Sequence, residues 1–453
     1  MKKRVGLLAL AVSGVFVSLL VWFQVRPLAR AASGYGAKIL CSGVFVSGRI
    51  PAEVVSQELA LDHPATRLLR YSIDRTALTA QASLLGLFPR TALYRPALGC
   101  TLDSDVSLAQ LRSQAALPPP PEPAAEPPLP PSPLDAVLEA AFREPDPSSP
   151  LRTRALVVML RGRLLAERYA PGFHRAMRLQ GWSMTKSIIN ALTGILVAQG
   201  RLRLDTPAPV PEWSSPSDPR HSITLDQLLR MSSGLAFQES YFDLTADAPI
   251  MLFRSPSAGD YAAARPLEVP PDSRWQYSSG TTNILSRILR DTFHGDLPAY
   301  WQFPRRELFD PIGARSATLE PGPDGAFVGS SFMYATARDW ARLGQLYLND
   351  GLWDGRRILP AGWVRYSTTP TPKAPRGRYG AQIWLNAGEP WDRASRDWPH
   401  LPPDTFAFNG FEGQHVIVIP SLQAVVVRLG LTQGRREWDP DAALLPILAA
   451  LPR

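Results

Sequence analysis

Short strand-like runs lie at both ends of the carboxyl-terminal two thirds of the chain. Residues 155–160 and 163–168 are two apolar runs joined by Arg161-Gly162, a dipeptide typical of a hairpin turn. Residues 415–419 and 424–429 form a second pair of this kind. The pattern predicts two β-hairpins, one from each end of this region.

The residues between the two predicted hairpins follow a helical period instead. From about 187 to 350, apolar residues recur mostly at spacings of three and four, with many Pro and Gly breaks. Helical runs also flank the hairpins at residues 134–143 and 441–451. Strands from both ends and helices between them predict an α+β fold, with one antiparallel sheet and a helical insertion packed beside it.

The amino terminus carries an uncharged apolar run from Val5 to Phe23, directly after the basic triplet that ends at Arg4. Its 19 residues would span roughly 28 Å as a helix, about the thickness of a bilayer core. The basic end stays in the cytoplasm, so the rest of the chain is expected to be exported to the periplasm. Two readings stay open. The run is an anchor in the inner membrane, or a signal peptide cleaved near Ala29-Arg30-Ala31.

Proline dominates residues 118–133, where ten of sixteen positions are Pro. Such a stretch favours an extended spacer, although a ligand for proline-recognition domains has the same composition. We therefore predict four parts, listed in chain order: a signal peptide or anchor (1–33), a small region (34–115), a Pro-rich linker (116–133) and a main domain (134–453).

Cys41 and Cys100 are the only cysteines of the chain. In an oxidising compartment we expect them to form a disulfide across the small region, the alternative being two unrelated buried thiols. Within that region, residues 39–47 look strand-like and residues 78–87 look helical.

Composition excludes several classes of function. Six His and two Cys without close clustering leave no zinc-site spacing, so no metal or cofactor is expected. The net charge of +8 comes from scattered arginines, without a basic stripe or a recognition motif, which argues against nucleic-acid binding. Only five of the 48 basic residues are lysines, and Lys186 is the one lysine between positions 39 and 372.

That lysine belongs to the motif Ser183-Met184-Thr185-Lys186 at the start of a strongly apolar helical run. A serine at a helix start has an unpaired backbone N–H that can hold an oxyanion. Lys186 lies one turn later on the same face and can accept the hydroxyl proton if burial lowers its pKa. The alternative is that Ser183 only caps the helix.

Two further segments carry candidate chemistry. Tyr277-Ser278-Ser279-Gly280 is turn-like and precedes another helical run, so that the Tyr277 phenol would project into a cleft where an ammonium lowers its pKa. The stretch from Gly410 to Gln414 enters a predicted strand, and its glycines permit close approach of a bound carbonyl to a backbone N–H. Taken alone, each is equally consistent with an ordinary loop or bulge.

In this order and spacing, the three segments resemble the serine β-lactamase and penicillin-binding protein superfamily. The resemblance covers residues 134–453 and is closest to β-lactamase-related esterases and amidases, including class C β-lactamases and 6-aminohexanoate-dimer hydrolases. It implies an antiparallel sheet flanked by helices, beside an all-helical subdomain.

The resemblance also implies roles for single residues. Ser183 corresponds to the acylated nucleophile, Lys186 to its proton acceptor, and Tyr277 to the group that moves protons to the leaving group and to water. The backbone N–H groups of Ser183 and Gln414 would form the oxyanion hole. Tyr241 is similar to a substrate-side tyrosine of the amide-hydrolysing branch.

Two departures from the family pattern affect substrate recognition. Ser279 stands where many relatives have Asn, and Phe411-Glu412-Gly413 stands where a motif beginning with Lys or His is usual. Because Phe411 cannot bind a carboxylate as a cation would, a less anionic substrate is expected.

The sequence thus predicts an exported serine hydrolase that cleaves a small ester or amide through a Ser183 acyl-enzyme. One alternative is a penicillin-binding DD-peptidase or weak β-lactamase. A third reading is a catalytically silent binding module of the cell envelope, which the departures at Ser279 and Phe411 would allow.

Overall fold

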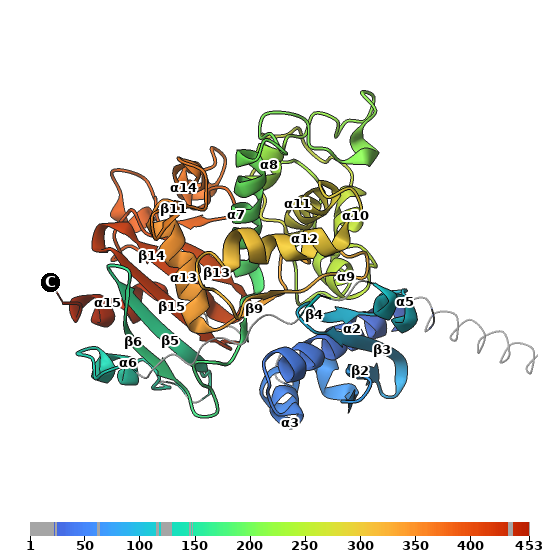
Figure 1. Ribbon diagram of the computed structural model, residues 1–453, viewed down its shortest axis with the longest axis horizontal. Helices are drawn as coiled ribbons and strands as arrows, with labels where there is room; N and C mark the ends of the chain where they lie inside the picture. The colour runs from blue at the N-terminus through green and yellow to red at the C-terminus, as the bar shows by residue number, and fades with distance from the viewer. Residues whose placement is uncertain are drawn as a thin grey trace, which may run out of the picture.

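A six-stranded antiparallel sheet forms the centre of the main domain in the computed structural model, which describes residues 22, 25–60, 64–114, 117–118, 129–144, 146, 148–433 and 438–452. The strand order is β12-β13-β14-β15-β5-β6 (Figure 1). The strands are β5 (Thr153–Leu160), β6 (Arg163–Tyr169), β12 (Trp384–Leu385), β13 (Phe406–Gly410), β14 (Gln414–Ile419) and β15 (Ala424–Gly430). Both predicted hairpins are confirmed, and β15 pairs with β5. The two ends of the domain therefore build one sheet, as the sequence predicts.

Alternation along these strands sends side chains into two separate cores. Val157 and Val427 face one core, whereas their neighbours Val158 and Val426 face the other. Helix α13 (Ala337–Leu348) covers the first face, while α6 (Asp135–Ala140) and α15 (Pro440–Ala449) pack into the second core. Helices therefore cover both faces of the sheet.

Helices are the main regular structure in the region between the two hairpins, as predicted, and they lie beside the sheet in Figure 1. They are α7 (Thr185–Ala198), α8 (Leu225–Leu229), α9 (Asp247–Phe253), α10 (Ala258–Ala263), α11 (Ser279–Asp291) and α12 (Leu297–Pro304). Helix α7 packs on α11 and on β13, so it stands where the helical part meets the sheet. The domain also contains α14 (Trp363–Thr368) and two small sheets. One has the order β7-β9-β8, from β7 (Leu179–Gln180), β8 (Thr318–Leu319) and β9 (Met333–Ala335), and the other is the hairpin of β10 (Leu352–Trp353) and β11 (Arg356–Arg357).

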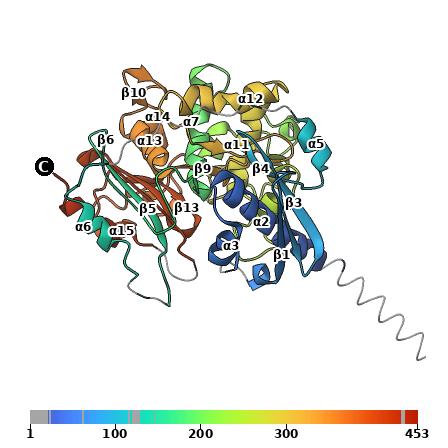
Figure 2. The same cartoon turned by 60° about the horizontal axis from the view of Figure 1, so that its bottom comes forward.

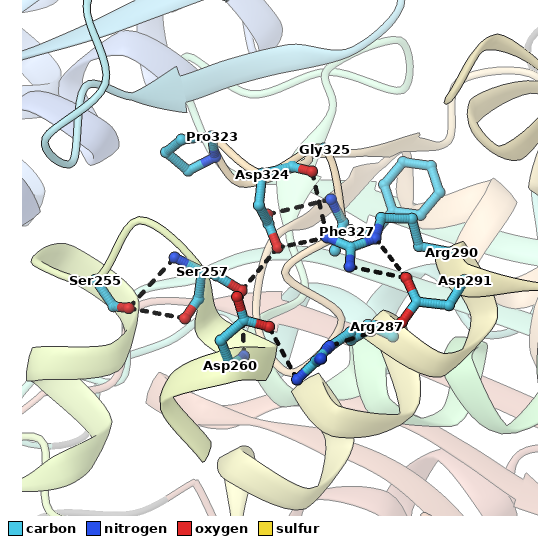
Figure 3. A network of polar contacts seen from close by, with 12 residues as sticks. Ser255, Ser257, Asp260, Arg287, Arg290, Asp291, Pro323, Asp324, Gly325 and Phe327 are labelled. Atoms are coloured by element: carbon cyan, nitrogen blue, oxygen red, sulfur yellow. Dashed lines mark hydrogen bonds and ion pairs between the residues drawn. The ribbon is translucent and has the colours of Figure 1, made fainter. Parts of the chain in front are cut away.

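A polar network ties α10 and α11 to the loop that follows β8 (Thr318–Leu319). The carboxylate of Asp324 accepts hydrogen bonds from Ser257 Oγ (2.8 Å) and Arg290 Nη1 (3.0 Å), and Arg287 pairs with Asp260 (3.0 Å; Figure 3). Burial raises the pKa of Asp324, although the Arg290 charge opposes that shift. The network holds one end of the segment that continues to Ser330.

The small amino-terminal region combines one long helix with a four-stranded sheet. Helix α2 (Arg26–Cys41) lies across the antiparallel sheet β1-β2-β3-β4, whose strands are β1 (Leu69–Asp74), β2 (Thr79–Leu84), β3 (Leu87–Arg95) and β4 (Gly99–Leu102). Short helices follow at α3 (Pro51–Val54) and α5 (Leu108–Ser113). The boundary predicted between residues 33 and 34 falls inside α2, where Ser33 is fully buried.

Two local predictions for this region are wrong. Residues 39–47 continue helix α2 into a further helical turn instead of forming a strand, because a short, uniformly apolar run has no period that separates the two states. Residues 78–87 contain strand β2 instead of a helix. Its alanines favour a helix locally, but Ala80 and Ala82 are buried in the sheet between β1 and β3, and pairing outweighs propensity.

A buried ion pair joins the amino-terminal region to the main domain. Lys38 Nζ pairs with the carboxylate of Glu320, which also accepts hydrogen bonds from Ser42 Oγ (2.9 Å) and from the backbone N–H of Cys100 (2.6 Å). Both partners are almost fully buried, so removing either one would leave an uncompensated charge. The two regions are therefore firmly docked.

No helix among the described residues is long and apolar enough to cross a membrane. The run from Val5 to Phe23 lies outside the described residues apart from Trp22, as do residues 119–128 of the predicted linker. The tripeptide Ala29-Arg30-Ala31 lies within α2, and both of its alanines are buried.

The expected disulfide between Cys41 and Cys100 is confirmed. It closes a loop with a sequence separation of 59 residues, for which chain entropy predicts about 4 kcal/mol of stabilisation. We expect the double variant Cys41→Ser, Cys100→Ser to unfold at a clearly lower urea concentration. Dithiothreitol should lower the wild-type midpoint and leave that of the double variant unchanged. Equal midpoints for wild type and variant would contradict this prediction.

Candidate active site

Ser183 lies in a single 3₁₀ turn, Trp182–Met184, immediately before α7. Close packing of two glycines positions this turn. A Cβ atom on Gly410, at the end of β13, would lie 2.1 Å from the carbonyl oxygen of Gly181. Trp182 takes a left-handed backbone conformation (φ 48°), which is costly for a bulky residue and typical of functional turns. The backbone thus presents Ser183 at the end of strand β13.

Lys186 is fully buried and makes three hydrogen bonds. Its ammonium donates to Ser183 Oγ (2.9 Å), to Ser279 Oγ (3.0 Å) and to the backbone carbonyl of Ser330 (3.0 Å). Burial lowers the pKa of Lys186 to about 8, while the nearby charge of Glu239 acts in the opposite direction. A substantial fraction of the amine is therefore neutral at slightly alkaline pH.

Tyr277 reaches the same place from the loop before α11. Its side chain is hydrogen-bonded to that of Ser183, and Lys186 Nζ lies 4.9 Å from the centre of its ring. The ring also packs against Tyr379 and Trp384, at centroid distances of 5.9 and 5.4 Å.

The expected direction of the Tyr277 pKa shift is wrong. Burial raises the pKa of this phenol, and the negative charge of Glu239 raises it further, whereas a neighbouring ammonium was expected to lower it. Desolvation of the phenolate is the largest cause of this shift. Tyr277 is therefore protonated in the resting site.

Ser279, the departure from Asn, is placed by a carboxylate that the sequence did not reveal. Glu239 accepts hydrogen bonds from Ser279 Oγ (2.6 Å), from Ser279 N (2.7 Å) and from the Tyr241 hydroxyl (2.9 Å). The Tyr241 hydroxyl also lies 3.1 Å from Ser279 Oγ. Glu239 sits in an irregular loop without hydrophobic period, and its position two residues before Tyr241 was the only available signal.

Ser330 is a second contact that sequence reasoning missed. Its backbone is held by Asn283 of α11, whose Oδ1 accepts from Ser330 N (3.3 Å) and whose Nδ2 donates to Ser330 Oγ (3.0 Å). A Cβ on the preceding Gly329 would lie 2.1 Å from Ser286 Oγ, so the backbone of this loop packs directly against α11. The Ser330 carbonyl is thereby aimed at Lys186.

Phe411 lies in an aromatic cluster next to Ser183. Its ring meets Trp182 edge-on at 5.7 Å and stacks on Tyr241 at 5.4 Å. The indole N–H of Trp182 donates to the carboxylate of the buried Glu412 (3.3 Å). Phe411 thus contributes an apolar wall beside Ser183.

Gly413 and Gln414 are hydrogen-bonded to residues of β15. The Gln414 amide donates to the Gly430 carbonyl (2.7 Å) and accepts from Gly430 N (3.0 Å). Gly413 has a positive φ of 78° and its carbonyl accepts from Arg428 (2.7 Å). The structure therefore brings Ser183, Lys186, Tyr277, Ser279, Tyr241 and Phe411 together. Gly413 lies in the same turn as Phe411, and Gln414 is the first residue of β14.

Metal-ligand clusters are absent from the part of the chain that the structure describes, since no three His, Cys, Asp or Glu side chains gather closely enough to hold an ion.

Comparison with known proteins agrees with this geometry. The beta-lactamase family profile matches residues 139–449, which is more than half of the chain. The 6-aminohexanoate-dimer hydrolase of Paenarthrobacter ureafaciens is 26% identical over 335 residues, covering 68% of this chain and 79% of that protein.

Two solved structures share the fold at low identity. A penicillin-binding protein homologue from Caulobacter crescentus superposes with a TM-score of 0.52 at 19% identity, covering 71% of this chain and 98% of its own. A family VIII carboxylesterase gives a TM-score of 0.52 at 15% identity, covering 70% and 97%. Together with the profile match, these likenesses lead to one conclusion: the chain belongs to the beta-lactamase family.

Proposed function

We propose that this protein is a serine hydrolase that cleaves an ester or amide bond through an acyl-enzyme on Ser183. The observation that carries the proposal is the position of the Lys186 amine, buried and 2.9 Å from Ser183 Oγ. A serine hydroxyl becomes a useful nucleophile only when a neighbouring base takes its proton. A pKa of about 8 suits Lys186 for this role near neutral pH.

Acylation follows from these positions. Neutral Lys186 takes the Ser183 proton as Oγ attacks the substrate carbonyl carbon, and the resulting oxyanion is held by backbone N–H groups. The N–H of Ser183 is one donor, and the N–H of Gln414 is the second that we propose. When the tetrahedral intermediate collapses, the bond to the leaving group breaks and Tyr277 donates its phenolic proton to the departing alcohol or amine. Lys186 then returns a proton to Tyr277.

Deacylation reverses these transfers with water in place of the leaving group. Water loses a proton to the Lys186 and Tyr277 pair and attacks the acyl carbon. Collapse of the second intermediate releases the carboxylic acid, and Ser183 Oγ takes the proton back. The raised pKa of Tyr277 supports its part, because a phenol that stays protonated is ready to donate to the leaving group.

The substrate class follows from the relatives and from the wall beside Ser183. The curated relative hydrolyses the 6-aminohexanoate dimer and one structural neighbour is a carboxylesterase, as their names state. Phe411 offers no positive charge for a carboxylate, which supports a neutral ester or amide over a β-lactam or a peptide terminus.

Labelling and turnover test the proposal together. The full chain should hydrolyse p-nitrophenyl acetate and react with a fluorophosphonate probe, with the label mapped to the peptide that contains Ser183. Slow, stable acylation by benzylpenicillin without ester turnover would instead indicate a penicillin-binding enzyme. Absence of both turnover and label would indicate a binding module and refute the proposal.

Export to the periplasm is part of the same proposal. The Cys41–Cys100 disulfide supports it, because structural disulfides persist in oxidising compartments. We propose that the residues before α2 direct export, and that α2 and the residues after it up to 115 form a small region held by this bond. Residues 116–133 then act as a linker to the hydrolase domain of residues 134–453.

Glu239 sets the pH range in which Lys186 acts. Its negative charge favours the ammonium form, so Glu239→Gln should lower the Lys186 pKa further. Since the neutral amine is the base, the rising limb of kcat/KM against pH should move to lower pH in this variant. A profile of kcat/KM from pH 5 to 10 measures the shift. The matched control is Glu268→Gln, an exposed carboxylate, which should leave the limb in place. A limb that does not move in Glu239→Gln would contradict the assignment.

A further inference from the structure

An apolar pocket adjoins the proposed nucleophile. Its lining is aliphatic and aromatic apart from the hydroxyls of one threonine and two tyrosines: Ala32, Tyr35, Thr66, Trp182, Tyr241, Phe242, Leu244, Pro249, Phe253 and Phe411. The empty space between its walls is roughly 530 Å³, including the open mouth. The centre of a water-sized sphere can occupy only about 30 Å³ of that space, so the pocket is narrow. The space therefore suits a slender chain better than a bulky ring, and no charged side chain lines it.

Two residues that line this pocket, Trp182 and Tyr241, border the proposed catalytic cluster. Trp182 directly precedes Ser183, and the Tyr241 hydroxyl lies 3.1 Å from Ser279 Oγ, which Lys186 also contacts. Phe411 bridges the two, because its ring contacts both Trp182 and Tyr241. A substrate whose carbonyl sits at Ser183 can therefore extend an apolar substituent into this pocket.

One wall of the pocket comes from outside the family domain. Ala32, Tyr35 and Thr66 belong to the amino-terminal region, whereas the family match begins at residue 139. Figures 1 and 2 show α2 lying against the helical part near α9. Tyr35 meets Phe253 of α9 edge-on at 5.2 Å, which closes that side.

This wall is held in place by polar contacts as well as by packing. A Cβ on Gly34 would lie 2.4 Å from the Phe253 carbonyl oxygen, and the same oxygen accepts a hydrogen bond from Arg90 Nη1 (3.2 Å). The buried ion pair of Lys38 and Glu320 fixes α2 about one turn after Gly34. The position of Ala32 relative to Trp182 is thus set by the fold and not by a flexible contact.

We propose that the amino-terminal region completes the substrate pocket of the enzyme and that this pocket binds a slender apolar chain of a neutral ester or amide. The inference rests on the proposed function and deepens it. It makes Ala32 a specificity-determining residue and explains why Phe411 is aromatic where a cation is usual.

Chain-length preference tests the inference. The wild type should show a kcat/KM at least about tenfold higher for p-nitrophenyl hexanoate than for the acetate, because each buried methylene adds binding energy. A second series of acetate esters, from ethyl to hexyl, tests the alcohol side. A chain-length preference in either series supports the pocket, and its absence from both overturns it.

Ala32→Leu should fill the pocket and reduce the chain-length preference, measured as the ratio of kcat/KM for the longest ester to that for the shortest, by about tenfold. Ala31→Leu is the matched control, since it makes the same change at the next position of α2, also buried but outside the pocket lining. Equal loss of preference in both variants would contradict the proposal.

Leu244→Ala probes the opposite wall and does not depend on the packing of α2. It should lower the ratio of kcat/KM for the longest ester to that for the shortest by several-fold. Absence of turnover of every ester in the wild type, together with absence of the fluorophosphonate label, would refute the proposed function itself. Ester turnover with the chain-length preference unchanged in both Ala32→Leu and Leu244→Ala would refute only the pocket.

Discussion

Ser183→Ala is expected to lower kcat for p-nitrophenyl acetate by about 10⁴-fold or more and to abolish fluorophosphonate labelling. The reason is that, among the residues that the structure describes, Ser183 alone combines a hydroxyl in contact with the buried amine and a place at the start of a helix next to the end of β13. Ser279 Oγ also contacts Lys186, but it donates to Glu239 and its helix position differs.

The matched control for this variant is Ser187→Ala, which lies one turn into α7. Its hydroxyl donates to the Gln382 carbonyl, so its loss removes a structural hydrogen bond and leaves the nucleophile in place. We expect kcat in the control within a few-fold of wild type. Labelling of Ser183→Ala at the wild-type rate would refute the assignment of the nucleophile.

Lys186→Arg is expected to slow acylation by about 10³-fold or more, because a guanidinium keeps its proton and cannot act as a base. In the wild type, kcat/KM should rise with pH through about 8, since raising the pH past the Lys186 pKa increases the neutral amine. This limb should be absent from Lys186→Arg. Rates of fluorophosphonate labelling between pH 6 and 10 measure both effects.

Lys373→Arg serves as the control, because Lys373 is an exposed lysine and the change is chemically the same. It should leave the pH profile unaltered. A wild-type limb near pH 8 that persists in Lys186→Arg would mean that another group is the base and would refute the assignment of Lys186.

Local sequence reasoning worked where a signal is short-range. The hairpin of β5 and β6 was readable because Arg161 and Gly162 both take positive φ values, 50° and 76°, which that turn requires. The Ser183 and Lys186 pair was readable because a helix places residues three apart on one face. The scarcity of lysine drew attention to Lys186. Its burial gives a physical reason for a lysine at this position, because burial lowers the pKa of the amine.

The errors arose where distant segments compete with local preference. Strand β2 looks helical by composition, yet its neighbours β1 and β3 lie within reach and α2 covers its face. The direction of the Tyr277 pKa shift was wrong because burial of the phenol cannot be read from a turn motif. Glu239 was missed for a related reason, because the amino-acid sequence of its loop does not indicate that the loop folds back onto Ser279.

The sequence by itself determined the α+β class, the two terminal hairpins, the cysteine pair and the serine–lysine motif, because each depends on near neighbours or on composition. Only the tertiary structure decided how Glu239, Ser279 and Ser330 surround the amine, and that Ala32 and Tyr35 line a pocket beside Trp182. Those contacts join residues far apart in the chain, and packing of the whole fold selects them. No local period or motif encodes that choice.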